Sequence, residues 1–132
     1  MKLITKALEA RFSELGIQET NPDPIVVAKF FNPSGIGTWY ATEYDKESKI
    51  CFGYVQLLEN EWGYFSIDEL EAIKTPPFGL PIERDLYCGE KKISEHCPEL
   101  IETIEKRKAQ NRISELKKLG QEKEDNDKSL SR

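Results

Sequence analysis

The Glu83-Arg84-Asp85 segment holds the residues with the clearest potential for chemistry. In an extended strand, successive side chains point to opposite faces, so Arg84 shares a face with the apolar Ile82. A guanidinium among apolar side chains needs a carboxylate partner, because an unpaired buried charge is costly. Glu43 is the best candidate partner, since the same alternation places it on one face with Trp39.

An Arg84–Glu43 pair has two interpretations. In the structural one, which we favour, the ion pair holds the proline-rich loop over residues 76–81 on the sheet. In the functional one, the charged groups line a polar ligand pocket with aromatic walls. The residues of that candidate ligand-binding pocket are Trp39, Tyr40, Glu43, Tyr64, Arg84 and Asp85.

Cys88, His96 and Cys97 form a second candidate cluster. Thiolates and imidazoles are zinc ligands, but a fourth ligand and a C-x-x-C pair are missing from this stretch. A nucleophilic cysteine needs an adjacent base, and nothing in the sequence places the single histidine, His96, beside a thiol. We therefore expect no catalytic residue, no metal and no cofactor.

The composition excludes several classes of protein. A chain of 132 residues has the size of one ordinary domain. Its 24 acidic and 19 basic residues give a net charge of −5, with 38% hydrophobic and 33% charged residues. This balance argues against a membrane span, a collagen-like repeat and a strongly cationic nucleic-acid binder.

The chain start and the cysteines predict a cytoplasmic location. Charged residues occur at once after Met1, so no signal peptide is expected. Three cysteines without close pairs make a poor disulfide framework, which agrees with a reducing compartment.

Charge and aromatic residues divide the chain. Residues 1–97 hold ten basic and sixteen acidic side chains, whereas residues 98–132 hold nine and eight. All thirteen aromatic residues precede residue 88. Because a core needs large apolar side chains, we predict one globular domain over residues 1–97, a helix over 98–120 and a disordered tail over 121–132.

The expected fold is α+β. Thr5 can cap a helix that ends at Gly16, and Ser66 can cap a short helix over residues 66–74. Between them, strand-like runs joined by short turns predict an antiparallel meander over residues 25–65, and residues 82–88 add a last strand. The result is a mostly antiparallel sheet of four or five strands with an N-terminal helix, a short helix after the meander and a C-terminal helix. Both faces of the middle strands are apolar, so the two earlier helices are expected to cover the sheet.

Six segments in this order form a recognisable set: Met1-Lys2-Leu3-Ile4-Thr5-Lys6, Lys29-Phe30-Phe31 with Pro33, Thr38-Trp39-Tyr40-Ala41-Thr42-Glu43, Phe52-Gly53, Gly63-Tyr64-Phe65-Ser66 with Glu69-Leu70, and Gly79-Leu80-Pro81-Ile82-Glu83-Arg84-Asp85. Together they resemble one bacterial family, catalogued as domain of unknown function 2958. The resemblance covers residues 1–88. It implies a setting among plasmids and other mobile elements, and because the family has no assigned reaction it implies no catalytic residue.

These observations favour a small non-enzymatic accessory protein of a bacterial mobile element that binds an unidentified protein partner. The alternative is a small-ligand-binding protein or enzyme that uses a carboxylate/arginine pocket. Nucleic-acid binding is a weaker third hypothesis, because an aromatic sheet can stack bases but the acidic body lacks a basic groove. A membrane partner is not expected.

Overall fold

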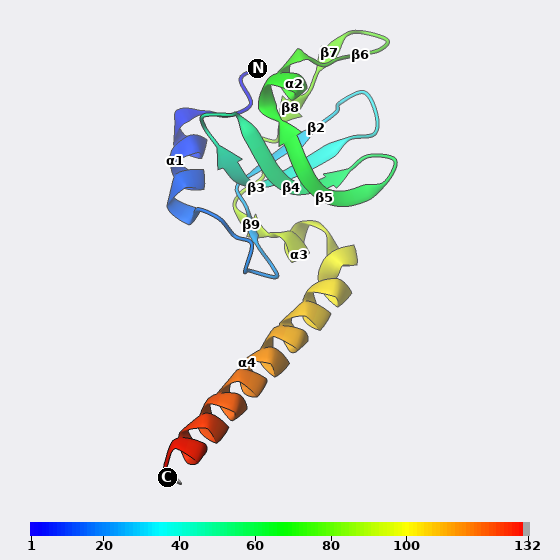
Figure 1. The fold of residues 1–132 in the computed structure, drawn as a ribbon. Helices are drawn as coiled ribbons and strands as arrows, with labels where there is room; N and C mark the ends of the chain where they lie inside the picture. The colour runs from blue at the N-terminus through cyan, green and yellow to red at the C-terminus, as the bar shows by residue number, and fades with distance from the viewer. Residues whose placement is uncertain (131–132) are drawn as a thin grey trace.

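A five-stranded antiparallel sheet organises the molecule (Figure 1). The computed structural model describes residues 1–130, with side chains up to Glu124. The strand order is β5-β4-β3-β2-β8, so β2 to β5 form the expected meander and the α+β fold is confirmed. The strands are β2 (Ala28–Phe31), β3 (Thr38–Asp45), β4 (Ile50–Gln56), β5 (Asn60–Ser66) and β8 (Glu83–Arg84).

Two helices pack on the first face of the sheet. In α1 (Lys6–Leu15), the Thr5 side chain accepts the first capping hydrogen bond and Gly16 ends the helix at φ 62°. In α2 (Ile67–Ala72), Ser66 accepts a hydrogen bond from the Glu69 N–H at 3.2 Å. The first core combines side chains of both helices, the strands and the chain start: Leu3, Phe12, Phe30, Trp39, Cys51, Ile67, Leu70 and Ile82, among others.

The second face is covered by the segment that follows the sheet. β1 (Ile25–Val26) pairs with β9 (Lys91–Lys92), which leads into α3 (Ile93–His96), the 3₁₀ turn η1 (Pro98–Leu100) and α4 (Ile101–Leu130). The buried side chains of this second core are Val26, Tyr40, Tyr54, Ile93, Cys97 and Ile104. The second core therefore includes a residue beyond position 97, and the expectation that the two earlier helices cover both faces of the sheet is wrong.

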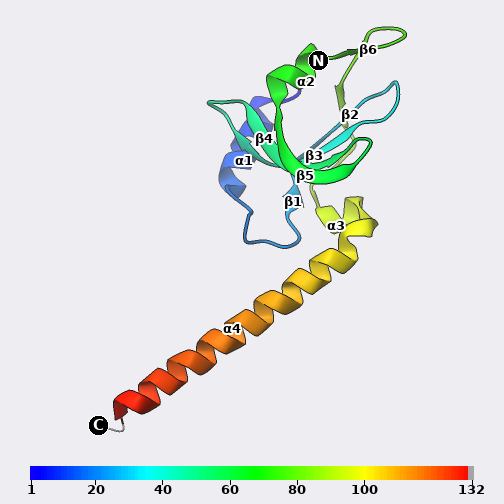
Figure 2. The ribbon, with the colours of Figure 1, turned by 45° about the vertical axis from the view of Figure 1, so that its right-hand side comes forward.

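Two elements differ in length from the expected ones. The strand expected over residues 82–88 is only Glu83–Arg84, preceded by a small hairpin of β6 (Lys74–Thr75) and β7 (Leu80–Pro81). The helix expected over 98–120 becomes α4, which projects from the body and runs to Leu130 (Figures 1 and 2). Helix thus occupies most of the tail expected to be disordered, and residues 131 and 132 lie outside the described residues.

A β-bulge interrupts the pairing of β3 with β4. Ala41 is opposite Gly53 and Glu43 is opposite Phe52, so Thr42 is an extra residue in β3. At this point the strands approach closely: a Cβ on Gly53 would lie 1.8 Å from the carbonyl oxygen of Tyr40. Only glycine fits at this position without a shift of the backbone.

Gly53→Ala is accordingly expected to destabilise the protein by about 3 kcal/mol or more, because the new methyl group overlaps backbone rather than a movable side chain. Gly63 is the matched control: it lies opposite Gly53 on β5, and a Cβ there meets nothing within 4 Å. Gly63→Ala should change stability by less than about 1 kcal/mol. Urea denaturation of both variants measures the difference, and equal costs would contradict the close approach.

Candidate functional site

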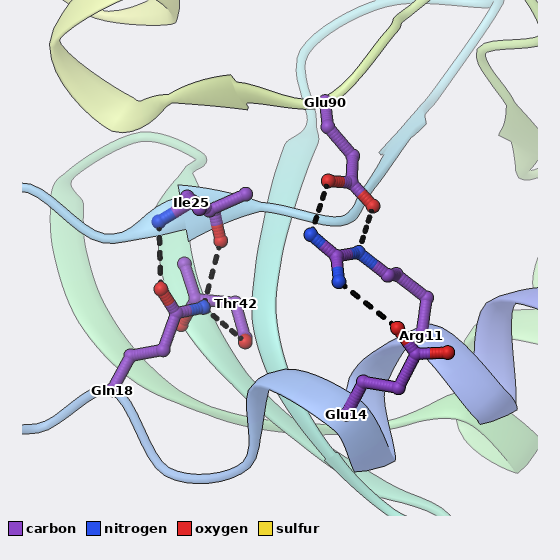
Figure 3. Close-up of polar contacts among 6 residues, drawn as sticks. All are labelled: Arg11, Glu14, Gln18, Ile25, Thr42 and Glu90. Atoms are coloured by element: carbon purple, nitrogen blue, oxygen red, sulfur yellow. Dashed lines mark hydrogen bonds and ion pairs between the residues drawn. The ribbon is translucent and has the colours of Figure 1, made fainter.

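Gln18 fixes the loop after α1 to the bulge. Its buried carboxamide donates from Nε2 to the carbonyl oxygens of Ile25 at 2.9 Å and Thr42 at 2.8 Å (Figure 3). Its Oε1 accepts from the Ile25 N–H at 2.8 Å. The side chain therefore pairs with backbone N–H and C=O groups that have no strand partner near the bulge.

The bulge decides which face Glu43 occupies. One extra residue reverses the alternation, so Glu43 lies on the face of Phe52 and Tyr54 and not on that of Trp39. Glu43 Oε2 accepts a hydrogen bond from the Gln18 N–H at 3.2 Å. The half-buried carboxylate is thus held at the end of the second face.

Glu43 lines a cleft between this face and the start of α4, which we name the Glu43 cleft. Its cavity volume is about 230 Å³. Arg107 closes one side by donating from Nη2 to the carbonyl oxygen of Glu19. The walls come from residues 18–24, from the sheet and from the chain after Cys97: Gln18, Glu19, Asn21, Pro22, Pro24, Thr42, Glu43, Phe52, Trp62, Leu100, Thr103, Ile104 and Arg107.

Next to the cleft, three rings form a row that we name the aromatic shelf: Phe52, Trp62 and Tyr64. The Phe52 ring centroid lies 6.0 Å from that of Trp62 and 4.9 Å from that of Tyr64. Trp62 is 38% exposed and Tyr64 is 79% exposed. Exposed aromatic rings held at fixed positions are typical of binding surfaces.

Arg84 does not contact Glu43. Its Nη1 donates to the carbonyl oxygens of Lys2 at 2.7 Å and Leu3 at 2.9 Å. Arg84 is opposite Phe30 in the first-core row, whereas the bulge turns Glu43 to the second face. The predicted ion pair is therefore wrong, and Arg84 instead holds the start of the chain against the sheet.

The six candidate ligand-binding residues do not surround one pocket. Trp39 and Tyr40 are buried in different cores on opposite faces. Asp85 lies 3.7 Å from Lys29 Nζ in an ion pair, and Tyr64 belongs to the exposed shelf. Of the six, only Glu43 lines the cleft. Gln18 and Arg107 also line it, and neither was predicted as a site residue: Arg107 was interpreted as part of a solvated basic helix face.

The fold does bring Cys88 and His96 together. Cys88 Sγ lies 3.6 Å from His96 Nε2, and the imidazole packs on the Tyr40 ring. Burial raises the pKa of the Cys88 thiol, with a further increase from Asp85. Burial lowers the pKa of His96, with Lys29 acting in the same direction. Both shifts favour a neutral thiol–imidazole pair, which is not an activated nucleophile.

The neighbouring Cys97 is also protonated near neutral pH, since burial raises its pKa to about 11. All three cysteines are free. Within the part of the chain that the structure describes, no three His, Cys, Asp or Glu side chains gather closely enough to hold a metal ion.

Fold and site together define a small α+β protein with a ligand-sized cleft and an aromatic surface on one face of its sheet. The chain belongs to the family described as protein of unknown function (DUF2958), whose model matches residues 3–103. The match confirms the resemblance to this family and extends it through Cys88 and His96 to the start of α4. Neither the curated proteins nor the solved structures contain a match. Among the described residues, no helix has both the length and the apolar character needed to cross a bilayer.

Arg84→Ala should lower stability by about 1–3 kcal/mol, because it removes charge-assisted hydrogen bonds to two backbone carbonyls. A double-mutant cycle with Glu43→Ala should give a coupling energy below about 0.5 kcal/mol, as expected for residues without a shared contact. Urea denaturation of the four proteins measures both quantities. A coupling energy well above about 0.5 kcal/mol would show that Arg84 and Glu43 interact after all.

His96 should titrate below the ordinary histidine pKa in the folded protein. Because the pKa of His96 is lower in the folded than in the unfolded protein, its contribution to the free energy of unfolding is complete above the unfolded-state pKa. This contribution is lost as the pH falls from the unfolded-state pKa through the folded-state pKa. Since it is the single histidine, one imidazole signal in a proton NMR titration measures the pKa directly. His96→Asn should flatten the loss of stability on acidification below about pH 6.5. A pKa above the ordinary value would contradict the buried, neutral pair.

Proposed function

We propose that this protein is a non-enzymatic accessory protein that binds a segment of another protein on its aromatic shelf. The observation that carries this proposal is the row of ring contacts from Phe52 to Trp62 and Tyr64 at the uncovered end of the second sheet face. Residues 93–104 cover the rest of that face and leave the shelf exposed. Aromatic side chains held in this way provide large contact areas with little loss of conformational entropy on binding.

The position of the shelf favours an extended partner segment. Among the described strands, β5 pairs only with β4 and forms one edge of the sheet, so its outer backbone groups face away from the sheet. An extended chain can add to such an edge through main-chain hydrogen bonds. Its alternate side chains would then lie beside Trp62 and Tyr64, which gives the contact its specificity.

Charge favours a basic segment as the partner. Residues 1–97 carry six more acidic than basic side chains, and Glu43 lies next to the shelf. Lys or Arg side chains of a partner are attracted by this acidic surface and can also pack on the exposed rings.

The same proposal places the protein in the cytoplasm of a bacterium that carries a mobile element. The family resemblance supports the genomic setting. Three free cysteines support a reducing compartment. Sequencing the DNA around genes of this family tests the genomic setting. The proposed setting is wrong if these genes do not lie near genes for plasmid or phage functions.

The Trp62→Ala/Tyr64→Ala variant tests the binding surface. Both proteins are first used to capture binding partners from a native cell extract. Each partner that the wild type retains and the variant does not is then purified and titrated directly against the wild type and against the variant. We expect a direct one-to-one complex that weakens at least 100-fold in the variant, since buried aromatic anchors carry much of an interface's energy. Thermal unfolding checks that the variant is folded: a moderate decrease in melting temperature is expected, because Trp62 is only 38% exposed and packs on Phe52 and Tyr54, whereas Tyr64 is 79% exposed.

Leu116→Ala is the matched control, because Leu116 is a large exposed apolar residue on α4, away from the shelf. It should bind the purified partner like the wild type. Equal binding by the shelf variant, or an equal loss in Leu116→Ala, would overturn the proposal.

A further inference from the structure

Three charged side chains line the Glu43 cleft: the exposed Glu19, the half-buried Glu43 and Arg107. Among the described side chains, the ion pairs involve none of these three. The basic neighbours of Arg107 behave differently: Lys106 pairs with Glu102, and Lys108 pairs with Glu105 along the helix. Arg107 instead lies at the cleft, where its guanidinium donates a hydrogen bond to the neutral carbonyl group of Glu19.

The lining between these charges is mostly apolar. Phe52 and Trp62 form the wall on the sheet side, and Leu100 and Ile104 form the wall on the helix side. The Gln18 carboxamide is already occupied by the backbone of Ile25 and Thr42. A ligand would therefore meet the Glu43 oxygen that does not bind Gln18, the exposed Glu19 carboxylate, one guanidinium and mostly apolar walls. The remaining polar side chains of the lining are Asn21, Thr42 and Thr103.

We infer that the cleft binds a small zwitterion of the amino-acid class, with its ammonium group at Glu43, its carboxylate at Arg107 and an apolar side chain between the aromatic and aliphatic walls. Each ligand charge then gains a charge-assisted hydrogen bond to an oppositely charged side chain. A cavity of about 230 Å³ is below the ~300–1,000 Å³ of pockets for drug-sized ligands, so it suits one amino acid and not a nucleotide.

This site does not depend on the proposed protein-binding function. Phe52 and Trp62 belong to both the shelf and the cleft, so the Trp62→Ala/Tyr64→Ala variant alters both. Tyr64 belongs to the shelf alone and Arg107 to the cleft alone, so Tyr64→Ala and Arg107→Gln test the two ideas separately. Arg107 lies just beyond residues 3–103, which the family model matches.

Three probes that share a phenyl ring test the inference in the full-length protein. They are phenylalanine, which is zwitterionic, phenethylamine, which carries only the amine, and 3-phenylpropionate, which carries only the carboxylate. Backbone amide and indole NMR shifts are followed up to the solubility limit of each probe. We expect saturable shifts centred on Gln18, Phe52 and Trp62, with a Kd for phenylalanine on the order of 1 mM or tighter. Phenylalanine should bind at least tenfold more tightly than either half-ligand.

Two charge-removing variants test which side chain binds the ammonium group of the probe and which binds its carboxylate. Glu43→Gln should weaken phenylalanine and phenethylamine at least tenfold and leave 3-phenylpropionate unchanged. Arg107→Gln should weaken phenylalanine and 3-phenylpropionate at least tenfold and leave phenethylamine unchanged. The matched control is Arg112→Gln on the exposed part of α4, which should bind all three probes like the wild type. The absence of saturable binding, equal affinity for the three probes, or an equal effect of the Arg112 control would overturn the inference.

Discussion

The hydrogen bonds of Gln18 to the β-bulge are the contacts on which the arrangement of this protein most depends. A bulge leaves backbone groups without ladder partners, and buried groups of this kind cost about 1–3 kcal/mol each when unsatisfied. Gln18 satisfies Thr42 and both backbone groups of Ile25 with one side chain. The same bonds tie three segments together: the loop after α1, the short β1 and the middle of the sheet.

The bulge also separates two surfaces with different roles. Without the extra residue, Glu43 would lie with Trp39 on the face of the first core; with it, the carboxylate reaches the second face. Arg84 is level with Trp39 and not with Glu43, since both Arg84 and Trp39 are opposite Phe30, and it binds the carbonyl groups of Lys2 and Leu3. The first face is therefore closed by the chain start and two helices, while the second keeps a charged cleft and exposed rings.

Local signals predicted the parts of the fold that depend on local physics. The caps at Thr5 and Ser66, the stop at Gly16 and the meander all follow from short-range hydrogen bonding and turn chemistry. The Arg84 partner was wrong for two reasons: strict alternation was assumed along β3, and the strand register, which places Arg84 level with Trp39 and not with Glu43, does not follow from the residues of one strand. An isolated glycine within a strand pattern indicates a bulge or a close backbone approach, and Gly53 was the signal that could have located it.

The partner of a bulge cannot be read from sequence in the same way. Gln18 lies in an irregular loop, where no periodicity assigns its side chain a direction, and its hydrogen bonds span seven and 24 residues.

The end of the late helix was difficult to predict for a different reason. Its interrupted apolar stripe gave no clear end, and the structure places Leu130 in the helix beyond the expected boundary.

The position of Arg107 follows from packing at the start of that helix. Residues three apart lie on the same helical face, so burial of Ile104 against the sheet brings Arg107 to the cleft. Lys106 lies two residues from Ile104, on another face, and pairs along the helix instead. Lys108, four residues from Ile104, lies beside a different hollow with Asp23 and Glu95. The packing of Ile104 thus leaves Arg107 at the Glu43 cleft and Lys108 outside its lining. The carboxylate is placed by a bulge and the guanidinium by a helix face, two constraints far apart in the sequence. The cleft therefore has its charges in place only after the sheet and the late helix have packed together.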